Sequence, residues 1–141
     1  MPALFESQGL RFLYPENWLV EQGETEQGWS VTVQSPGTAF LLVSVDKARP
    51  SVQQVLDTAL ATLRDDYPDL EAEPATERIA GRTARGYDVQ FFSLDLVNSC
   101  LLRSFRAGDQ TLLILCQASD LELEAAEPVL RAVRASLELV T

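Results

Sequence analysis

Few residue types able to carry out chemistry occur in this chain, which contains no histidine. Without histidine, Ser–His and Cys–His nucleophile pairs and the common histidine-based zinc sites are excluded. Lys47, the sole lysine, falls at the end of a predicted strand with no serine motif around it. Gly81 and Gly86 fall within or between predicted strands and form no phosphate-binding loop. We therefore predict that the protein is not an enzyme and has no catalytic, cofactor-binding or metal-binding residues.

Carboxylate clusters remain as candidates, because paired carboxyls can do acid–base chemistry and carboxylate oxygens suit calcium. The clusters are Asp65, Asp66 and Asp69 at the end of one predicted helix, and Glu122, Glu124 and Glu127 early in another. The first lacks the ligand spacing and turn glycine of a calcium loop, and the second complements a helix dipole. We expect both clusters to be solvated. A carboxylate-based hydrolase stays a third hypothesis, which requires a concave cluster of acids with perturbed pKa values.

Arginine is the dominant basic residue, which raises the question of phosphate recognition by guanidinium groups. The nearest approach to a cluster is Arg78, Arg82 and Arg85. Acids surround these positions in excess, so we expect the three arginines to be ion-paired.

The two cysteines, Cys100 and Cys116, fall on predicted strands joined by a tight turn at Gly108 and Asp109. If that turn has two residues, Cys100 pairs with Gln117 and Leu101 pairs with Cys116. The two thiols then lie on opposite faces of the sheet, too far apart for a disulfide. A three-residue turn would reverse this conclusion. We predict free, buried cysteines.

Composition predicts one folded domain spanning residues 1–141, with an apolar content of 46%. The 21 acidic residues outnumber the 11 basic ones, giving a formal charge of −10. Such a surface disfavours binding to nucleic acid or to an anionic membrane. The start of the chain has no basic or apolar leader pattern, and no run approaches the ~20 apolar residues of a membrane span. We therefore expect a cytoplasmic protein.

Periodicity predicts two helices. Apolar residues from Val52 to Leu63 recur at helical spacing, and Ser51 with Gln54 forms a capping box. A closing helix starts near Asp120, with a kink or break expected at Pro128.

The remaining segments predict strands. These are Leu10 to Tyr14, Trp18 to Val20, Gly28 to Ser35, Ala39 to Asp46, Leu70 to Ile79, Thr83 to Leu94, Leu96 to Arg106 and Thr111 to Ala118. The order of strands, helix, strands and helix, with short connections, predicts an α+β fold with an antiparallel sheet of about six strands. Helices flank this sheet on both faces, as an α/β/α sandwich.

Both faces of the predicted sheet are apolar, which is unusual for an antiparallel sheet. Ala39, Leu41, Val43 and Val45 share one face of their strand while Phe40 and Leu42 occupy the other, and Phe92 and Leu94 lie opposite Tyr87, Val89 and Phe91. A helix about 24 Å long and about 11 Å wide cannot cover a six-stranded face nearly 30 Å across. We therefore predict that one apolar sheet face around Phe40, Leu42, Phe92 and Leu94 binds a protein partner, either a client or a second copy.

Two alternatives stay open. Loops such as 21–28 would leave no binding face if they covered this surface. An enclosed cavity of a few hundred Å³ would favour a domain that binds a small apolar ligand instead of a protein.

Short signals along the whole chain resemble the Mog/PsbP-like fold family, which includes type VI effector chaperones and DcrB-like domains of unknown function. They comprise Leu10-Arg11-Phe12-Leu13-Tyr14-Pro15 followed by Trp18, a strand closing at Ser35-Pro36, the helix after Ser51, Ile79-Ala80-Gly81-Arg82-Thr83-Ala84, the Arg106-Ala107-Gly108-Asp109 hairpin and the final Ala135-Ser136-Leu137. The resemblance implies an α/β/α sandwich around an antiparallel sheet. It also implies a mostly non-catalytic role, with partners that differ among members.

Overall fold

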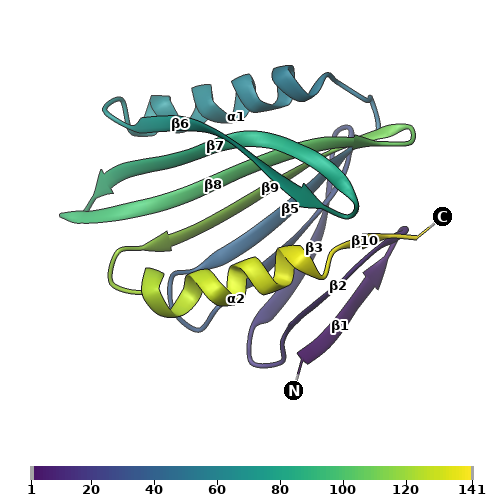
Figure 1. Ribbon diagram of the computed structural model, residues 1–141, viewed down its shortest axis with the longest axis horizontal. Coiled ribbons are helices and arrows are strands. Elements are labelled where there is room, and N and C mark those ends of the chain that lie inside the picture. The colour runs from purple at the N-terminus through teal and green to yellow at the C-terminus, as the bar shows by residue number, and fades with distance from the viewer. Residues whose placement is uncertain (1, 141) are drawn as a thin grey trace.

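The computed structural model describes residues 2–140 and contains two antiparallel sheets and two helices (Figure 1). The larger sheet has seven strands in the order β3-β4-β5-β9-β8-β7-β6. Their bounds are β3 Leu19–Thr25, β4 Gly28–Gln34, β5 Phe40–Asp46, β6 Glu71–Ile79, β7 Arg82–Ser93, β8 Leu96–Ala107 and β9 Gln110–Ser119. The three-stranded sheet, in the order β1-β2-β10, consists of β1 Pro2–Ser7, β2 Leu10–Pro15 and β10 Glu138–Leu139.

Helix α1, Val52–Asp66, begins as its sequence predicts. The Ser51 side chain accepts a hydrogen bond from the backbone N–H of Gln54, 3.0 Å away. Leu56 and Leu60 are buried, and the helix packs on β8 and β9. At its C-terminal end, the ring of Tyr67 stacks on Phe91 of β7 at a centroid distance of 4.0 Å.

Helix α2, Leu123–Ala135, packs against β9 and β2 and so bridges the two sheets. Its buried residues include Ala126, Leu130 and Val133. Pro128 lies inside the helix, yet the helix is continuous, so of the kink or break expected there the break does not occur. Proline removes one backbone donor, and here the buried apolar stripe of α2 outweighs that loss.

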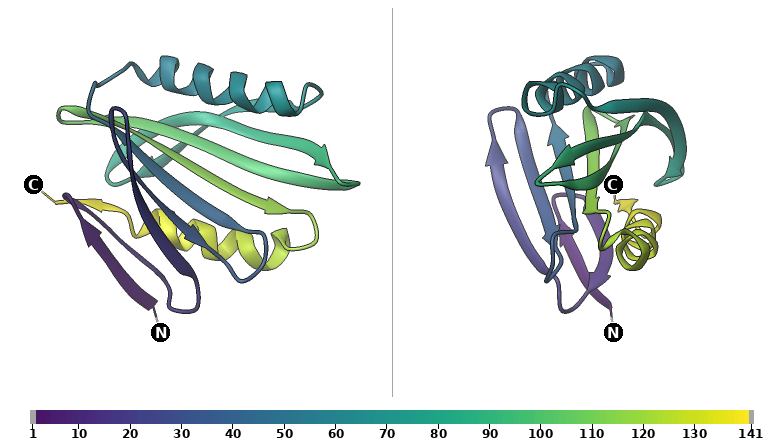
Figure 2. Two further views of the ribbon diagram at one scale, coloured as in Figure 1. Left: turned by 180° about the vertical axis from the view of Figure 1, so that it is seen from behind. Right: turned by 90° about the vertical axis from the view of Figure 1, so that its left-hand side faces the viewer.

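The helices cover opposite faces of the large sheet, in agreement with the predicted α/β/α arrangement (Figure 2). On one face, α2 and the small sheet cover a core that includes Val31, Leu41, Val43 and Ile114. On the other face, α1 covers a smaller core that includes Leu102. Alternate residues of β9 serve both cores, because successive side chains of a strand point to opposite faces.

The large sheet has seven strands instead of about six, and the described residues form ten strands in all where eight segments were predicted. Residues 21–28, which one alternative treated as a covering loop, mostly belong to β3, which pairs with β4. This strand is exposed along nearly its whole length, so the apolar alternation that marks a strand is missing. Strands β1 and β10 were not predicted either. In β1 the exposed Leu4 interrupts the apolar–polar alternation, and β10 has only two residues.

The cysteine prediction is confirmed. Ala107 pairs with Gln110, so the turn has two residues, and Cys100 pairs with Gln117 while Leu101 pairs with Cys116. Both cysteines are free and buried.

Candidate functional site

The four residues predicted to bind a partner do not share a face. Phe40 lies in the same cross-strand row as Gln117, Cys100 and Val89, and therefore on the α1 side of the sheet. Phe92 is three positions beyond Val89 on β7, so its side chain faces the opposite side. The prediction of one continuous face is wrong because the sheet register, which determines the face, was not known for these strands. Partner binding by each residue stays a prediction.

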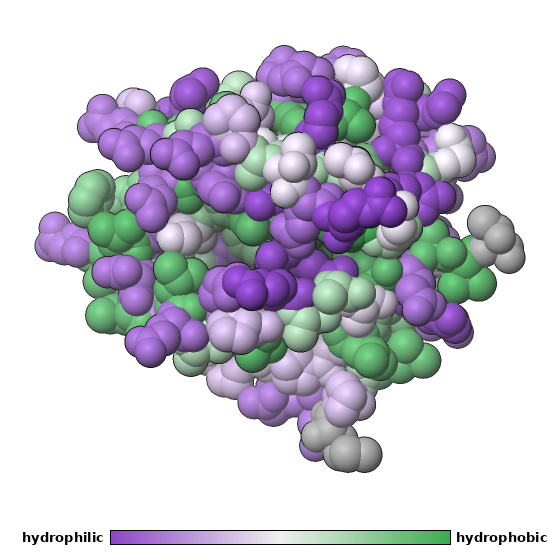
Figure 3. Space-filling view, viewed as in Figure 1, coloured by the Kyte–Doolittle hydropathy of each residue, from purple (hydrophilic) through white to green (hydrophobic). Residues whose placement is uncertain are grey.

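The three large apolar side chains with the highest exposed fractions gather at one end of the molecule. We call this surface the apolar tip, and it consists of Phe92, Leu94 and Leu121. They are 75%, 93% and 79% exposed, respectively. Phe92 pairs with Val97 across the β7–β8 hairpin, and the carbonyl of Val97 accepts a hydrogen bond of 2.7 Å from the backbone of Asp120. This bond holds the β9–α2 loop, and with it Leu121, beside the hairpin. Figure 3 shows hydrophobic atoms gathered at this end, on the left of the view.

The backbone at the tip is strained. Leu94 and Asp95 form the two-residue β7–β8 turn with φ angles of +52° and +62°. The same left-handed conformation occurs at Gln8–Gly9 and Ala80–Gly81, where the second residue is glycine. A leucine adopts it only at a cost of about 1 kcal/mol or more, whereas aspartate tolerates it better. The fold therefore projects Leu94 into solvent from a conformation that its own sequence disfavours.

A groove of about 490 Å³ opens between α2 and the β6–β7 end of the sheet. That end curls toward the side on which α2 packs (Figure 2, right). Apolar residues that line the groove include Leu101, Ala118, Leu123 and Leu130. Acidic residues that line it are Glu71, Glu73, Asp88 and Glu127. Figure 3 shows hydrophilic atoms crowded at its position in the centre of the view.

The groove and the apolar tip are continuous. Asp88 and Gln90 line the groove and alternate with Val89 and Phe91 along β7. Phe92 is the next residue on the Asp88–Gln90 side of the strand, so it extends the same surface beyond the groove. Together they form one amphipathic surface, with carboxylates at the centre and apolar side chains at the end.

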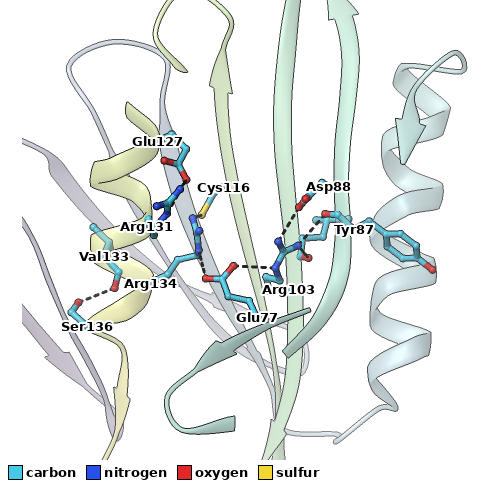
Figure 4. A network of polar contacts seen from close by, with 11 residues as sticks. Glu77, Tyr87, Asp88, Arg103, Cys116, Glu127, Arg131, Val133, Arg134 and Ser136 are labelled. Atoms are coloured by element: carbon cyan, nitrogen blue, oxygen red, sulfur yellow. Dashed lines mark hydrogen bonds and ion pairs between the residues drawn. The ribbon is translucent and has the colours of Figure 1, made fainter. Parts of the chain in front are cut away.

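Beneath the groove, a network of ion pairs around two buried arginines joins the sheet to α2 (Figure 4). The carboxylate of Glu77 accepts from Nε of Arg103 at 3.1 Å and from Nε of Arg134 at 2.8 Å. Nη2 of Arg103 also donates to Asp88 at 2.9 Å, and Nη1 of Arg134 lies 3.6 Å from the Cys116 sulfur. Both arginine side chains are 5% exposed. The groove is thus built on a rigid, hydrogen-bonded base.

The groove environment alters the pKa of two of these groups. Burial raises the pKa of the Cys116 thiol to about 11, although the positive charge of Arg134 opposes the shift. Burial also acts to lower the pKa of Arg134, but the hydrogen bond to Glu77 and the charges of Cys116 and Glu77 raise it more. The thiol is therefore protonated and the arginine charged at neutral pH, so Cys116 is not a nucleophile in this state.

Two carboxylates of the groove have no ion-pair partner in the part of the chain that the structure describes. Arg103 and Arg134 neutralise Glu77 and Asp88, and Arg131 contacts Glu127 at 2.6 Å one turn away. Within residues 2–140, Glu71 and Glu73 have no ion-pair partner, and both are exposed. The surface that a ligand would meet therefore carries excess negative charge.

Sequence reasoning did not find this network. It expected ion pairs at Arg78, Arg82 and Arg85, but Arg78 and Arg82 donate to carbonyls of the 80–81 turn. That expectation is wrong because the β6–β7 turn brings these carbonyls closer than any carboxylate. The sequence does contain a signal for the network. Arg103 shares a predicted apolar face with Leu101 and Phe105, and a charge on such a face requires a buried partner.

Asp65, Asp66 and Asp69 are exposed, as expected, whereas one acid of the second cluster has a structural role. Glu122 caps the β4–β5 loop by accepting hydrogen bonds from the backbone and the hydroxyl of Thr38. Among residues 2–140, no three histidine, cysteine or acidic side chains are placed to hold a metal ion. No helix in the same range has the length and apolar character that crossing a membrane requires.

No family model matches the chain, and no curated protein matches it by sequence. Solved structures do match. The solution structure of cyanobacterial PsbP (CyanoP) from Synechocystis sp. PCC 6803 aligns over 98% of this chain and 92% of its own, with a TM-score of 0.69 at 14% identity. LpqN of Mycobacterium tuberculosis, involved in cell envelope biogenesis, aligns over 100% and 90%, with a TM-score of 0.63 at 10% identity.

A third solved structure matches this chain with a lower TM-score. The protein of unknown function PA94 from Pseudomonas aeruginosa aligns over 92% of this chain and 91% of its own, with a TM-score of 0.52 at 12% identity. At these identities the likeness concerns the fold alone. The chain is an α+β protein with the Mog/PsbP-like fold.

Proposed function

We propose that this chain is a non-enzymatic protein-binding module whose partner docks on the apolar tip and the adjoining groove. The observation that carries the proposal is the strained, 93% exposed Leu94 beside Phe92 and Leu121. Exposed apolar side chains that gather in one patch usually mark an interaction surface. Backbone strain at such a patch favours a role in binding, because folding alone does not require it.

A protein partner fits the groove better than the alternative of a small apolar ligand. An apolar ligand site is typically enclosed and lined with few polar groups. Here the groove opens to the surface and carries four carboxylates. Its apolar residues continue into the tip, which is too exposed to enclose a small molecule.

Replacing Phe92 and Leu94 with serine tests the proposal. Because each side chain releases about 1.5–3 kcal/mol when fully buried, the double variant is expected to bind the partner at least tenfold more weakly. The partner is first captured with the wild-type protein, and its Kd is then measured by calorimetry. Leu4→Ser, at a 58% exposed leucine of β1, is the matched control. Equal affinity of all three proteins would refute the proposal.

A homodimer through the α1 side of β5 is a second candidate, favoured by Phe40 and Leu42. Both are half-buried, and neither belongs to either hydrophobic core. Phe40→Ser is expected to dissociate such a dimer in sedimentation experiments. A wild-type monomer would exclude this candidate. The cytoplasmic location stays a prediction from the sequence.

A further inference from the structure

The groove differs from the apolar tip in one respect that concerns the partner: its carboxylates. We infer that the groove binds a segment of the partner protein in which arginine or lysine residues adjoin large apolar residues. This inference rests on the proposed function and adds the chemistry of the partner.

The charge of the groove complements a cationic segment. Glu71 and Glu73 project from β6 toward the groove side, since they pair with Gln90 and Asp88 of the groove. Within residues 2–140 no arginine neutralises them. A chain with formal charge −10 adds a long-range field of the same sign. A cationic segment is attracted by both, whereas an anionic segment is repelled by both.

Acidic and apolar surfaces follow one another along the groove and the tip. The groove presents Leu101, Leu123 and Leu130 between its acidic walls. Beyond its end, Phe92 and Leu121 continue the apolar surface, with the exposed Asp95 and Asp120 at its margin. A segment that alternates basic and apolar residues can place its charges against Glu71 and Glu73 and its apolar side chains on the floor and the tip. A uniformly basic segment would leave the tip exposed.

The groove is preformed. Glu77 binds Arg103 and Arg134 at its base, so the strands and α2 are held at a set separation. The fixed walls reduce the entropy that binding would otherwise cost. The arginines at the base cannot compete for Glu71 and Glu73, because Glu77 and Asp88 already bind them.

Two labelled synthetic peptides of twelve residues test the inference by fluorescence anisotropy. Both carry leucine and tryptophan at the same positions, and one has arginine where the other has glutamate. The arginine peptide is expected to bind at least tenfold more tightly, and its affinity is expected to fall as salt rises. Equal affinity for both peptides, or no binding of the arginine peptide, would overturn the inference.

Variants localise the binding. Glu71→Gln with Glu73→Gln is expected to weaken binding of the arginine peptide by about fivefold at low salt. Glu21→Gln with Glu24→Gln, on exposed β3, makes the same change in net charge and is expected to have less than a twofold effect. Equal effects of the two pairs would mean that only net charge matters, and would overturn the groove assignment.

The two proposals can fail separately. Arginine-peptide binding that depends on Glu71 and Glu73 but is unchanged by Phe92→Ser would refute the role of the tip alone. Peptide binding that is lost in Phe92→Ser but shows no preference for arginine would refute the cationic partner alone. Circular dichroism of each variant confirms that the fold is intact before binding is measured.

Discussion

Glu77 of β6 and Arg134 of α2 lie 57 positions apart in the chain, yet their Oε2 and Nε atoms form a hydrogen-bonded ion pair of 2.8 Å. Arg103 of β8 binds the other oxygen of the same carboxylate at 3.1 Å. One carboxylate thus compensates two guanidinium groups that are almost wholly removed from water. This arrangement connects three elements that the chain order separates.

Removing the charge of Glu77 should therefore lower the free energy of unfolding. Glu77→Gln leaves Arg134 without a carboxylate and Arg103 with only Asp88, and the expected loss in the free energy of unfolding is about 3 kcal/mol. Urea denaturation measures it. Glu73→Gln on the same strand removes the same charge, but its carboxylate has no partner within residues 2–140, so its expected effect is within about 0.5 kcal/mol. Similar losses in the two variants would contradict the network.

Phe91 and Phe92 are neighbours with opposite surroundings. Phe91 is 3% exposed and stacks on Tyr67, whereas Phe92 is 75% exposed. Phe91→Ala is expected to cost about 3–5 kcal/mol because it opens a cavity under α1. Phe92→Ala is expected to change stability by about 0.5 kcal/mol or less. Thermal and urea unfolding compare them, and a larger loss in Phe92→Ala would mean that the register of β7 is shifted by one residue.

The β7–β8 turn offers a change that should stabilise the fold while removing Leu94 from the apolar tip. Asn–Gly in place of Leu94–Asp95 suits the two positive φ angles, so Leu94→Asn with Asp95→Gly is expected to raise the free energy of unfolding by about 1 kcal/mol. The same variant should bind the partner more weakly, because Leu94 is gone. If the variant is more stable but binds the partner equally well, neither Leu94 nor the strained turn is needed for binding.

The buried thiols should make stability fall in alkaline solution. Burial raises the pKa of Cys100 to about 12 and that of Cys116 to about 11, above the ordinary value of 9.0. Their contribution is fully present below pH 9.0. Above it, the unfolded chain releases protons that the folded chain keeps, so the free energy of unfolding decreases as pH rises toward 11 or 12.

Denaturation series between about pH 8 and pH 11 check this slope. The Cys100→Ala, Cys116→Ala double variant should show a shallower slope, even though its stability at neutral pH is lower. An unchanged slope would mean that the thiols titrate alike in both states. Native protein should also react slowly with a thiol reagent that modifies both cysteines after unfolding.

Much of the fold follows from local patterns in the sequence. The apolar spacing from Val52 to Leu63 and the cap at Ser51 determine α1. The Gly108–Asp109 turn determines the register of β8 against β9, and therefore places the two cysteines on opposite faces. These features were predictable because each depends on residues close together in the chain.

Only the tertiary structure decided the site. Phe92 and Asp88 lie on the α2 side of the large sheet, and Phe40 lies on the α1 side. The side that each residue occupies depends on how seven strands align. The contact of Glu77 with Arg103 and Arg134 depends on how β6, β8 and α2 are brought together. Strand pairing and ion pairing at such separations are set by the packing of the whole chain, because many alternative partners satisfy the same local patterns. Composition and periodicity thus determined the layers of this protein, and long-range packing determined which side chains meet in its groove.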